Sequence, residues 1–158
     1  MQISEKGLDF IKFFEGCSLK LYNDCACPPN ATIGIGHLVH LGPIDGTEPE
    51  EFKAGLSEQD ALDLLAADTE HTAFWVTTLV KVPLNQNQFD ALVSFTFNVG
   101  TNALKHSTAL ARLNSGDYAG ASEALNMWVN SGEYHKVPGL VKRRAAEQLF
   151  FNTGTVPA

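Results

Sequence analysis

The sequence contains no long hydrophobic run, and no segment reaches the roughly 18 uninterrupted apolar residues of a membrane-spanning helix. Its first residues include Glu5, Lys6, Asp9 and Lys12, a charge density that excludes a secretory signal and a signal anchor. We therefore expect synthesis in the cytoplasm and no membrane insertion. Positive charge is also scarce, with 11 Lys and Arg against 18 Asp and Glu and a net charge of −7. No general nucleic-acid role is expected, because binding phosphate requires a basic face.

Cysteine is scarce as well, and the three cysteines, Cys17, Cys25 and Cys27, are an odd number. They have no accompanying histidine at a spacing that suits zinc, so the sequence predicts no metal site and no cofactor. Synthesis in the cytoplasm favours three reduced thiols. The alternative is a disulfide from Cys17 to Cys25 or Cys27, formed after transfer to an oxidising compartment.

The most informative stretch runs from residue 14 to residue 40 and contains two acidic residues in contrasting settings. Glu15 follows Leu8, Ile11 and Phe14, which have helical spacing, so it is expected at a helix C-terminus. The helix dipole and apolar neighbours there disfavour ionisation. Asp24 ends an alternating segment before a Cys- and Pro-rich turn, where a wetter setting keeps it charged. Two such carboxyl groups suit cleavage of a glycosidic bond.

The segment Thr32-Ile-Gly-Ile-Gly-His37, after Glu15-Gly16 and Asp24, resembles the active-site hairpin of the phage-type lysozymes, the muramidases of glycoside hydrolase family 24. In that family an Asp follows the helix-ending Glu-Gly after eight intervening residues, as Asp24 does here, and a Thr opens the pattern T-I-G-x-G-H. One departure is the connection from Asp24 to Thr32, which has seven residues where the family has about five. The extra length lies in a Pro-rich turn that can absorb it.

The resemblance implies hydrolysis of the β-1,4 bond between N-acetylmuramic acid and N-acetylglucosamine. Glu15 would be the general acid, and Asp24 with Thr32 would hold the attacking water on the opposite face of the sugar, so inversion is expected. It also assigns Asn98, Arg143 and Gly34 to substrate binding. Arg143 belongs to the basic run Lys142 to Arg144, and would approach Glu15 from across the cleft.

His37 closes the motif and could be mistaken for a catalytic group. The register of the long helix that follows places Asp68 within its reach, so we expect a structural pair of His37 with Asp68. The remaining histidines, at positions 40, 71, 106 and 135, are interpreted as surface residues. Trp128 and Tyr134 are candidates for stacking on the substrate.

The predicted fold is α+β and lysozyme-like, as one domain over residues 1–158. A small β-hairpin lobe at about 15–55 contains strands at 19–22 and 32–35, a third short strand near 37–41, and a polar loop at 42–51. A long helix at about 57–82 connects it to a larger helical lobe at about 84–152, on which residues 1–14 pack. Helices are expected from 85 or 86 to 97, at 107–114 and 117–127, and from 137 or 138 to 151. No strand is expected after residue 80. The active-site cleft would lie between the lobes.

The resemblance favours a phage endolysin or prophage lysozyme, a monomer whose partner is the peptidoglycan of the bacterial cell wall. It would be made in the host cytoplasm and would reach the periplasmic wall after a holin permeabilises the membrane. Its negative charge predicts activity that depends strongly on salt. Two alternatives remain at this point: a lytic transglycosylase, which needs only the acid, and a non-catalytic peptidoglycan-binding protein.

Overall fold

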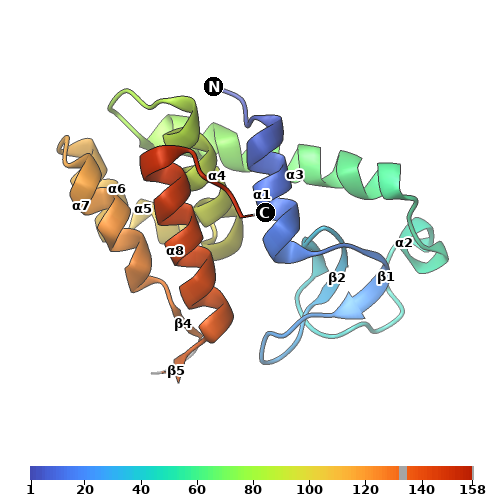
Figure 1. The fold of residues 1–158 in the computed structure, drawn as a ribbon. Coiled ribbons are helices and arrows are strands. Elements are labelled where there is room, and N and C mark those ends of the chain that lie inside the picture. The colour runs from blue at the N-terminus through green and yellow to red at the C-terminus, as the bar shows by residue number, and fades with distance from the viewer. Residues whose placement is uncertain (132–134, 158) are drawn as a thin grey trace. The chain divides into compact units, whose positions relative to one another are not determined.

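The computed structural model describes residues 1–131 and 135–157, and Figure 1 shows its helices and strands. The chain forms two compact units. The hairpin unit comprises Lys12–Asp68, and the helical unit comprises Met1–Ile11 with Thr69–Ala158. Two helices continue from one unit into the other, namely α1 (Glu5–Glu15) and α3 (Glu58–Leu79).

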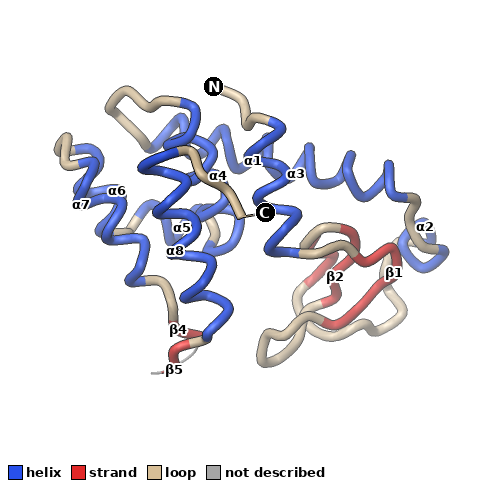
Figure 2. Tube along the Cα trace, in the orientation of Figure 1, coloured by secondary structure: helices blue, strands red, loops and turns tan. Residues whose placement is uncertain are grey.

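The hairpin unit contains a three-stranded antiparallel sheet in the order β1-β2-β3, drawn in red in Figure 2. Its strands are β1 (Ser18–Asn23), β2 (Ala31–Gly34) and β3 (His37–His40), and a one-turn helix, α2 (Glu50–Ala54), follows them. All four residues of the central strand β2 are buried. The sequence predicts two strands joined by a Pro-rich turn and a third short strand, and all three are present as β1, β2 and β3.

Local side-chain chemistry sets the ends of the helices that bound the sheet. The hydroxyl of Ser4 accepts a hydrogen bond from Gly7 N at 3.2 Å, which caps α1. Ser57 and Asp60 form a reciprocal capping box at the start of α3. Ser57 N donates to Asp60 Oδ2 at 2.9 Å, and Asp60 N donates to Ser57 Oγ at 3.1 Å. These contacts fix the first turns of α1 and α3.

The helical unit is built around α4 (Gln86–Val99), whose residues 89–96 are all buried. This helix packs against α8 (Pro138–Thr153), and α5 (Thr101–Lys105), α6 (Thr108–Asn114) and α7 (Tyr118–Ala124) complete the unit. Phe10 of α1 stacks on Phe150 of α8 with ring centroids 5.1 Å apart. No helix in the described part of the chain has the length and apolar character that a membrane span requires.

The structure corrects the predicted elements at several places. A two-stranded ribbon, β4 (Asn130–Ser131) with β5 (His135–Lys136), lies where no strand was expected, because two-residue strands leave no alternation in a sequence. The sequence did not predict helices α2 and α5 for a similar reason, since a helix of one turn is too short to show a periodic pattern of apolar residues. The helix predicted at 117–127 ends at Ala124 and continues as a 3₁₀ turn, Leu125–Met127.

Candidate active site

Glu15 is the last residue of α1 and lies against the turn between β2 and β3. A Cβ atom added to Gly36 in this turn would lie 2.9 Å from Glu15 Oε2, so any larger residue would displace the carboxylate. Gly36 also has a φ angle of +68°, which other residues rarely adopt. The second glycine of the sequence motif is thus explained by its close approach to Glu15.

Gly34, the first glycine of the motif, is buried and also has a positive φ angle, +65°. A Cβ atom at this position would lie 3.7 Å from Ala61 of α3 and from Leu56, which is ordinary van der Waals contact. The predicted contact of Gly34 with substrate would therefore involve its backbone, and it stays a prediction.

Asp24 directly follows β1, and three donors hold its carboxylate. Oδ1 accepts from Ala26 N at 3.0 Å and from Asn30 N at 2.8 Å, while Oδ2 accepts from the Asn30 side-chain amide at 3.2 Å. Burial raises the pKa of Asp24, but the hydrogen bonds from Asn30 and Ala26 outweigh this effect, and the pKa lies below its usual range. The carboxylate is therefore ionised at neutral pH, as its position in the sequence predicts.

Thr32 lies in β2 opposite Tyr22 of β1 and is only 4% exposed. Its hydroxyl donates to the carbonyl oxygen of Asn30 at 3.2 Å. Asp24 and Thr32, the two residues predicted to hold water, are therefore bonded to the same third residue. Sequence reasoning missed Asn30, which lies inside the turn and belongs to no part of the motif.

Tyr22 links the two carboxyl groups electrostatically. Burial raises the pKa of its phenol, and the negative charges of Glu15 and Asp24 raise it further. The phenol therefore lies in the field of both groups and remains a neutral hydroxyl. Within the hairpin unit, Glu15, Tyr22, Asp24 and Thr32 form one candidate site.

His37 lies at the start of β3 and makes the contact that its position predicts. Its Nδ1 lies 2.8 Å from Asp68 Oδ2, and its ring makes an edge-to-face contact with Phe52, with centroids 5.7 Å apart. This pair connects the end of the motif to α3 inside the hairpin unit. That His37 serves as structural support, rather than as an acid or base, remains a proposal.

In the helical unit, a buried ionic network surrounds the predicted binding residues. Arg143 is 4% exposed, and its Nε donates to Glu147 Oε1 at 3.1 Å while a terminal nitrogen donates to the carbonyl of Ser94 at 3.3 Å. Arg144 is fully buried and donates to Glu147 and to the side-chain carbonyl of Asn98. Arg143 and Arg144 of the basic run are thus buried and hydrogen-bonded within this network.

Trp128 packs within the same unit. Its ring makes an edge-to-face contact with Phe95 at a centroid distance of 6.1 Å, and its carbonyl accepts from Arg144 Nε at 3.0 Å. The guanidinium of Arg144 lies over the Phe95 ring, 5.0 Å from its centroid. Tyr134, the other candidate for stacking, lies outside the described residues.

The three cysteines are unpaired and exposed, which agrees with the interpretation as thiols. The alternative disulfide from Cys17 to Cys25 or Cys27, expected after transfer to an oxidising compartment, stays a prediction. Both Cys25 and Cys27 belong to the turn that follows Asp24.

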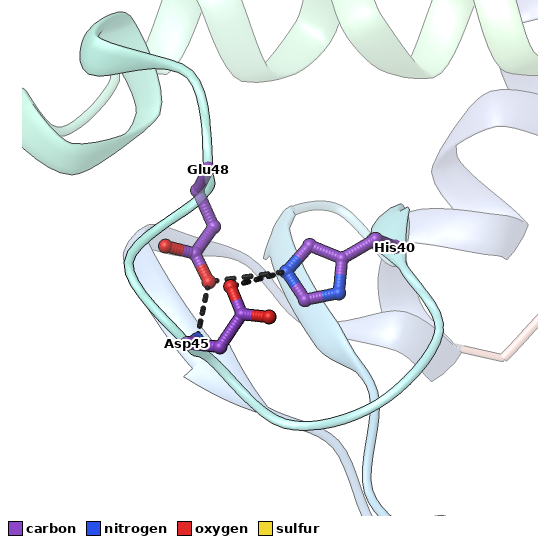
Figure 3. Close-up of side chains that lie close together, drawn as sticks. All are labelled: His40, Asp45 and Glu48. Carbon is purple, nitrogen blue, oxygen red and sulfur yellow. Dashed lines mark hydrogen bonds and ion pairs between the residues drawn. The ribbon is translucent and has the colours of Figure 1, made fainter.

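A second cluster in the hairpin unit consists of His40, Asp45 and Glu48 (Figure 3). Their potential ligand atoms all lie within 4.8 Å of one another, a set that could bind a divalent cation. However, the Glu48 carboxylate already accepts from Asp45 N at 2.8 Å, from Gly46 N at 3.0 Å and from His40 Nε2 at 3.1 Å. Loop closure therefore explains the cluster without an ion.

His40 was interpreted as a surface residue, and the structure places it half-buried at the surface. One ring nitrogen lies 3.0 Å from the carbonyl oxygen of Leu41, and its Nε2 faces Glu48. Glu48 itself is only 3% exposed, although it lies in the stretch predicted as a polar loop.

Comparison with known proteins identifies the family. The phage lysozyme family model matches residues 12–147. The endolysin of Acyrthosiphon pisum secondary endosymbiont phage 1 is 40% identical over 97% of this chain and 99% of its own length. The endolysin of Bacillus phage PZA is 41% identical over 98% of this chain, which spans only 57% of that longer protein. The solved endolysin from Escherichia coli O157:H7 phage FAHEc1 is 37% identical, with a TM-score of 0.82 over 100% of this chain and 98% of its own. The chain therefore belongs to the phage lysozyme family.

Proposed function

We propose that the chain is an endolysin that hydrolyses the β-1,4 bond between N-acetylmuramic acid and N-acetylglucosamine during phage lysis. As a phage lysozyme it is a glycoside hydrolase that acts on peptidoglycan. One observation carries the assignment of roles. Asp24 and Thr32 are bonded to a common residue, Asn30, and Glu15 lies against the turn between β2 and β3 of the same sheet.

Glu15 is the general acid in this proposal. It donates a proton to the glycosidic oxygen as the bond from that oxygen to the anomeric carbon breaks, and the leaving sugar departs as an alcohol. A water molecule attacks the anomeric carbon from the opposite face, and Asp24 accepts the proton that this water loses. Charge and protons balance, and the configuration at the anomeric carbon inverts.

The hydrogen bonds of Asp24 and Thr32 leave them suited to hold that water. The Thr32 hydroxyl donates its proton to Asn30, so its lone pairs can accept from water. Asp24 Oδ1 accepts from Ala26 N and Asn30 N, whereas Oδ2 accepts from the Asn30 side chain. We assign proton acceptance to Oδ2, because it has the greater remaining capacity.

We assign substrate binding to Asn98, Arg143 and Gly34. Asn98 is an exposed residue, and the contact with Arg144 occupies the carbonyl end of its side chain. We assign its NH2 end as the donor to a sugar hydroxyl or acetamido group. The pair of His37 with Asp68 supports the hairpin by fixing the start of β3.

The cellular setting is part of the same proposal. The protein is a monomer made in the host cytoplasm, and it reaches the periplasmic wall after a holin permeabilises the membrane. Its substrate is the peptidoglycan layer.

The test compares wild type with Glu15→Gln on purified Gram-negative peptidoglycan, with the ends of released muropeptides identified by mass spectrometry. We expect reducing N-acetylmuramic acid ends from wild type and none from Glu15→Gln. Glu5→Gln is the matched control, because Glu5 lies at the opposite end of the same helix. Anhydro ends would instead indicate a lytic transglycosylase, and no release by wild type would leave a peptidoglycan-binding protein.

A further inference from the structure

The turn after Asp24 differs in length from the pattern of the family, and Asn30 is the residue that closes it. Asp24 N donates to the Asn30 carbonyl at 3.0 Å, and Asn30 N donates back to Asp24 Oδ1 at 2.8 Å. The backbone bond extends the pairing of β1 and β2 one step beyond Asn23 and Ala31, and the second bond closes the turn through the Asp24 side chain. Residues 25–29 therefore project beyond the closed pairing, and Thr32 lies opposite Tyr22 despite the longer turn.

The side chain of Asn30 adds a second set of contacts. Its Nδ2 donates to Asp24 Oδ2 at 3.2 Å, and its Oδ1 accepts from Gly42 N at 3.1 Å, just after β3. Its carbonyl also accepts from the Thr32 hydroxyl. One residue thus contacts the carboxylate, the hydroxyl and the segment that follows the third strand.

We infer that Asn30 is a positioning residue, which fixes the Asp24 carboxylate and the Thr32 hydroxyl relative to each other so that they can hold one water molecule. This inference rests on the proposed roles of Asp24 and Thr32. Asn30 does not touch the substrate, and it acts through these two residues.

The chemistry of the amide explains why this position suits asparagine. The amide has a donor and an acceptor on one planar group, so Asn30 can donate to Asp24 and accept from Gly42 together. Aspartate has the same shape but would place a second negative charge against Asp24. A neutral donor also orients the Asp24 carboxylate without supplying a cation that would neutralise it.

Loss of the amide changes both geometry and titration. In Asn30→Ala the backbone donors to Asp24 remain, but the donor to Oδ2 is lost. The hydrogen bonds lower the pKa of Asp24 in the wild type, so removing one of them raises it. Asp24 is then protonated at a higher pH, and the acidic limb of the activity profile moves upward.

Asn23 provides a matched control in the same hairpin. Its side-chain oxygen accepts from Ile44 N at 2.8 Å, so it also connects the β1–β2 hairpin to the segment after β3. It makes this contact without bonding to the Asp24 carboxylate. Asn23→Ala therefore removes a similar structural hydrogen bond and leaves the proposed water-holding pair in place.

The experiment measures kcat, KM and the pH profile on soluble peptidoglycan fragments for wild type, Asn30→Ala, Asn30→Asp and Asn23→Ala. We expect Asn30→Ala to lower kcat about tenfold, the effect of losing a hydrogen bond to a charged group, with little change in KM. Its acidic limb moves to higher pH, and that of Asn30→Asp moves further. Asn23→Ala keeps the wild-type kcat and profile.

The position of the acidic limb does not depend on the amount of folded enzyme, so partial misfolding of a variant cannot mimic the expected shift. An acidic limb and a kcat in Asn30→Ala that match those of Asn23→Ala would overturn the inference. Asp24→Asn is measured in parallel. If Asp24→Asn is inactive while Asn30→Ala behaves as wild type, the positioning role of Asn30 is wrong and the proposed role of Asp24 stands. If Asp24→Asn remains fully active, the proposed role of Asp24 is wrong.

Discussion

The hairpin unit contains two loops in which backbone N–H groups donate to a single carboxylate, Asp24 in one and Glu48 in the other. The two carboxylates differ in whether a neighbouring group places a positive charge against them. Asp24 gathers donors from the turn at 25–30, and Glu48 gathers donors from the loop that contains Asp45 and Gly46. Asp24 is half-buried, whereas Glu48 is 3% exposed. A carboxylate that accepts hydrogen bonds from its own loop thus occurs twice, once at the candidate active site and once in a purely structural loop.

The third partner of each carboxylate makes the difference. Glu48 faces the imidazole of His40, whose other ring nitrogen lies against the Leu41 carbonyl. A carbonyl only accepts, so the nitrogen at Leu41 carries a proton, and a bond to ionised Glu48 requires a second proton on Nε2. Protonated His40 therefore places a positive charge against Glu48. Asp24 is held by the neutral amide of Asn30, so its negative charge remains available to accept a proton.

The largest expected effect separates these two carboxylates by activity. Asp24→Asn lowers kcat/KM by roughly 10²–10⁴-fold, the range for loss of an acid or base group, because an amide cannot accept the proton from water. Glu48→Gln keeps activity per folded molecule but lowers Tm. Its NH2 group would face the backbone N–H of Asp45 or Gly46, which leaves that donor without its acceptor.

The measurement pairs kcat/KM with thermal unfolding for both variants, each normalised to folded protein. Each carboxylate is the control for the other. Equal losses of activity in the two variants, or a larger loss of Tm in Asp24→Asn than in Glu48→Gln, would remove the distinction between them.

A smaller effect is expected in the dependence of stability on pH. The hydrogen bonds with Leu41 and Glu48 raise the pKa of His40 above its ordinary value of 6.5. Donation from Asp45 N lowers the pKa of Glu48 below its ordinary value of 4.5. His40 therefore contributes stability that is complete below pH 6.5 and is lost as the pH rises through its raised pKa. Glu48 contributes stability above pH 4.5 that is lost as the pH falls through its lowered pKa.

The check is Tm against pH for wild type and His40→Gln. We expect the largest difference in Tm where His40 is charged and Glu48 is ionised, and a smaller difference on either side of this window. Asp45, whose Oδ1 lies 3.8 Å from His40 Nε2, also favours the cation. If the difference in Tm between wild type and His40→Gln were the same at every pH, the charge of His40 would not contribute to stability.

Much of the candidate site could be predicted because its residues lie close together in the sequence. Each local element has its own sequence signal: the apolar period before Glu15, the alternation before Asp24 and the glycines after Thr32. These signals correspond to α1, β1 and β2, which follow one another along the chain. The pair of His37 with Asp68 could be predicted from helix register alone. The catalytic and binding roles themselves remain predictions.

The hydrogen-bond partners of the site residues could not be predicted, because these contacts depend on how loops close and not on the periodicity of apolar residues. Nothing in the sequence marks Asn30 as the partner of Asp24 across the turn, or Glu48 as a buried residue in a polar loop. The buried ionic network of α8, in contrast, could have been predicted from the spacing of its charged residues in the sequence. Arg143 and Arg144 precede Glu147 by four and three residues, which places all three on one face of a helix.

The most direct test of the proposed mechanism is the configuration of the product at the moment of cleavage. Proton NMR of a soluble peptidoglycan oligosaccharide, recorded before mutarotation, shows which anomer of the new reducing N-acetylmuramic acid forms first. If Asp24 and Thr32 direct water to the opposite face of a β-linked sugar, the α anomer appears first. Initial formation of the β anomer would show retention, and would contradict the proposal that these residues deliver water in a single displacement.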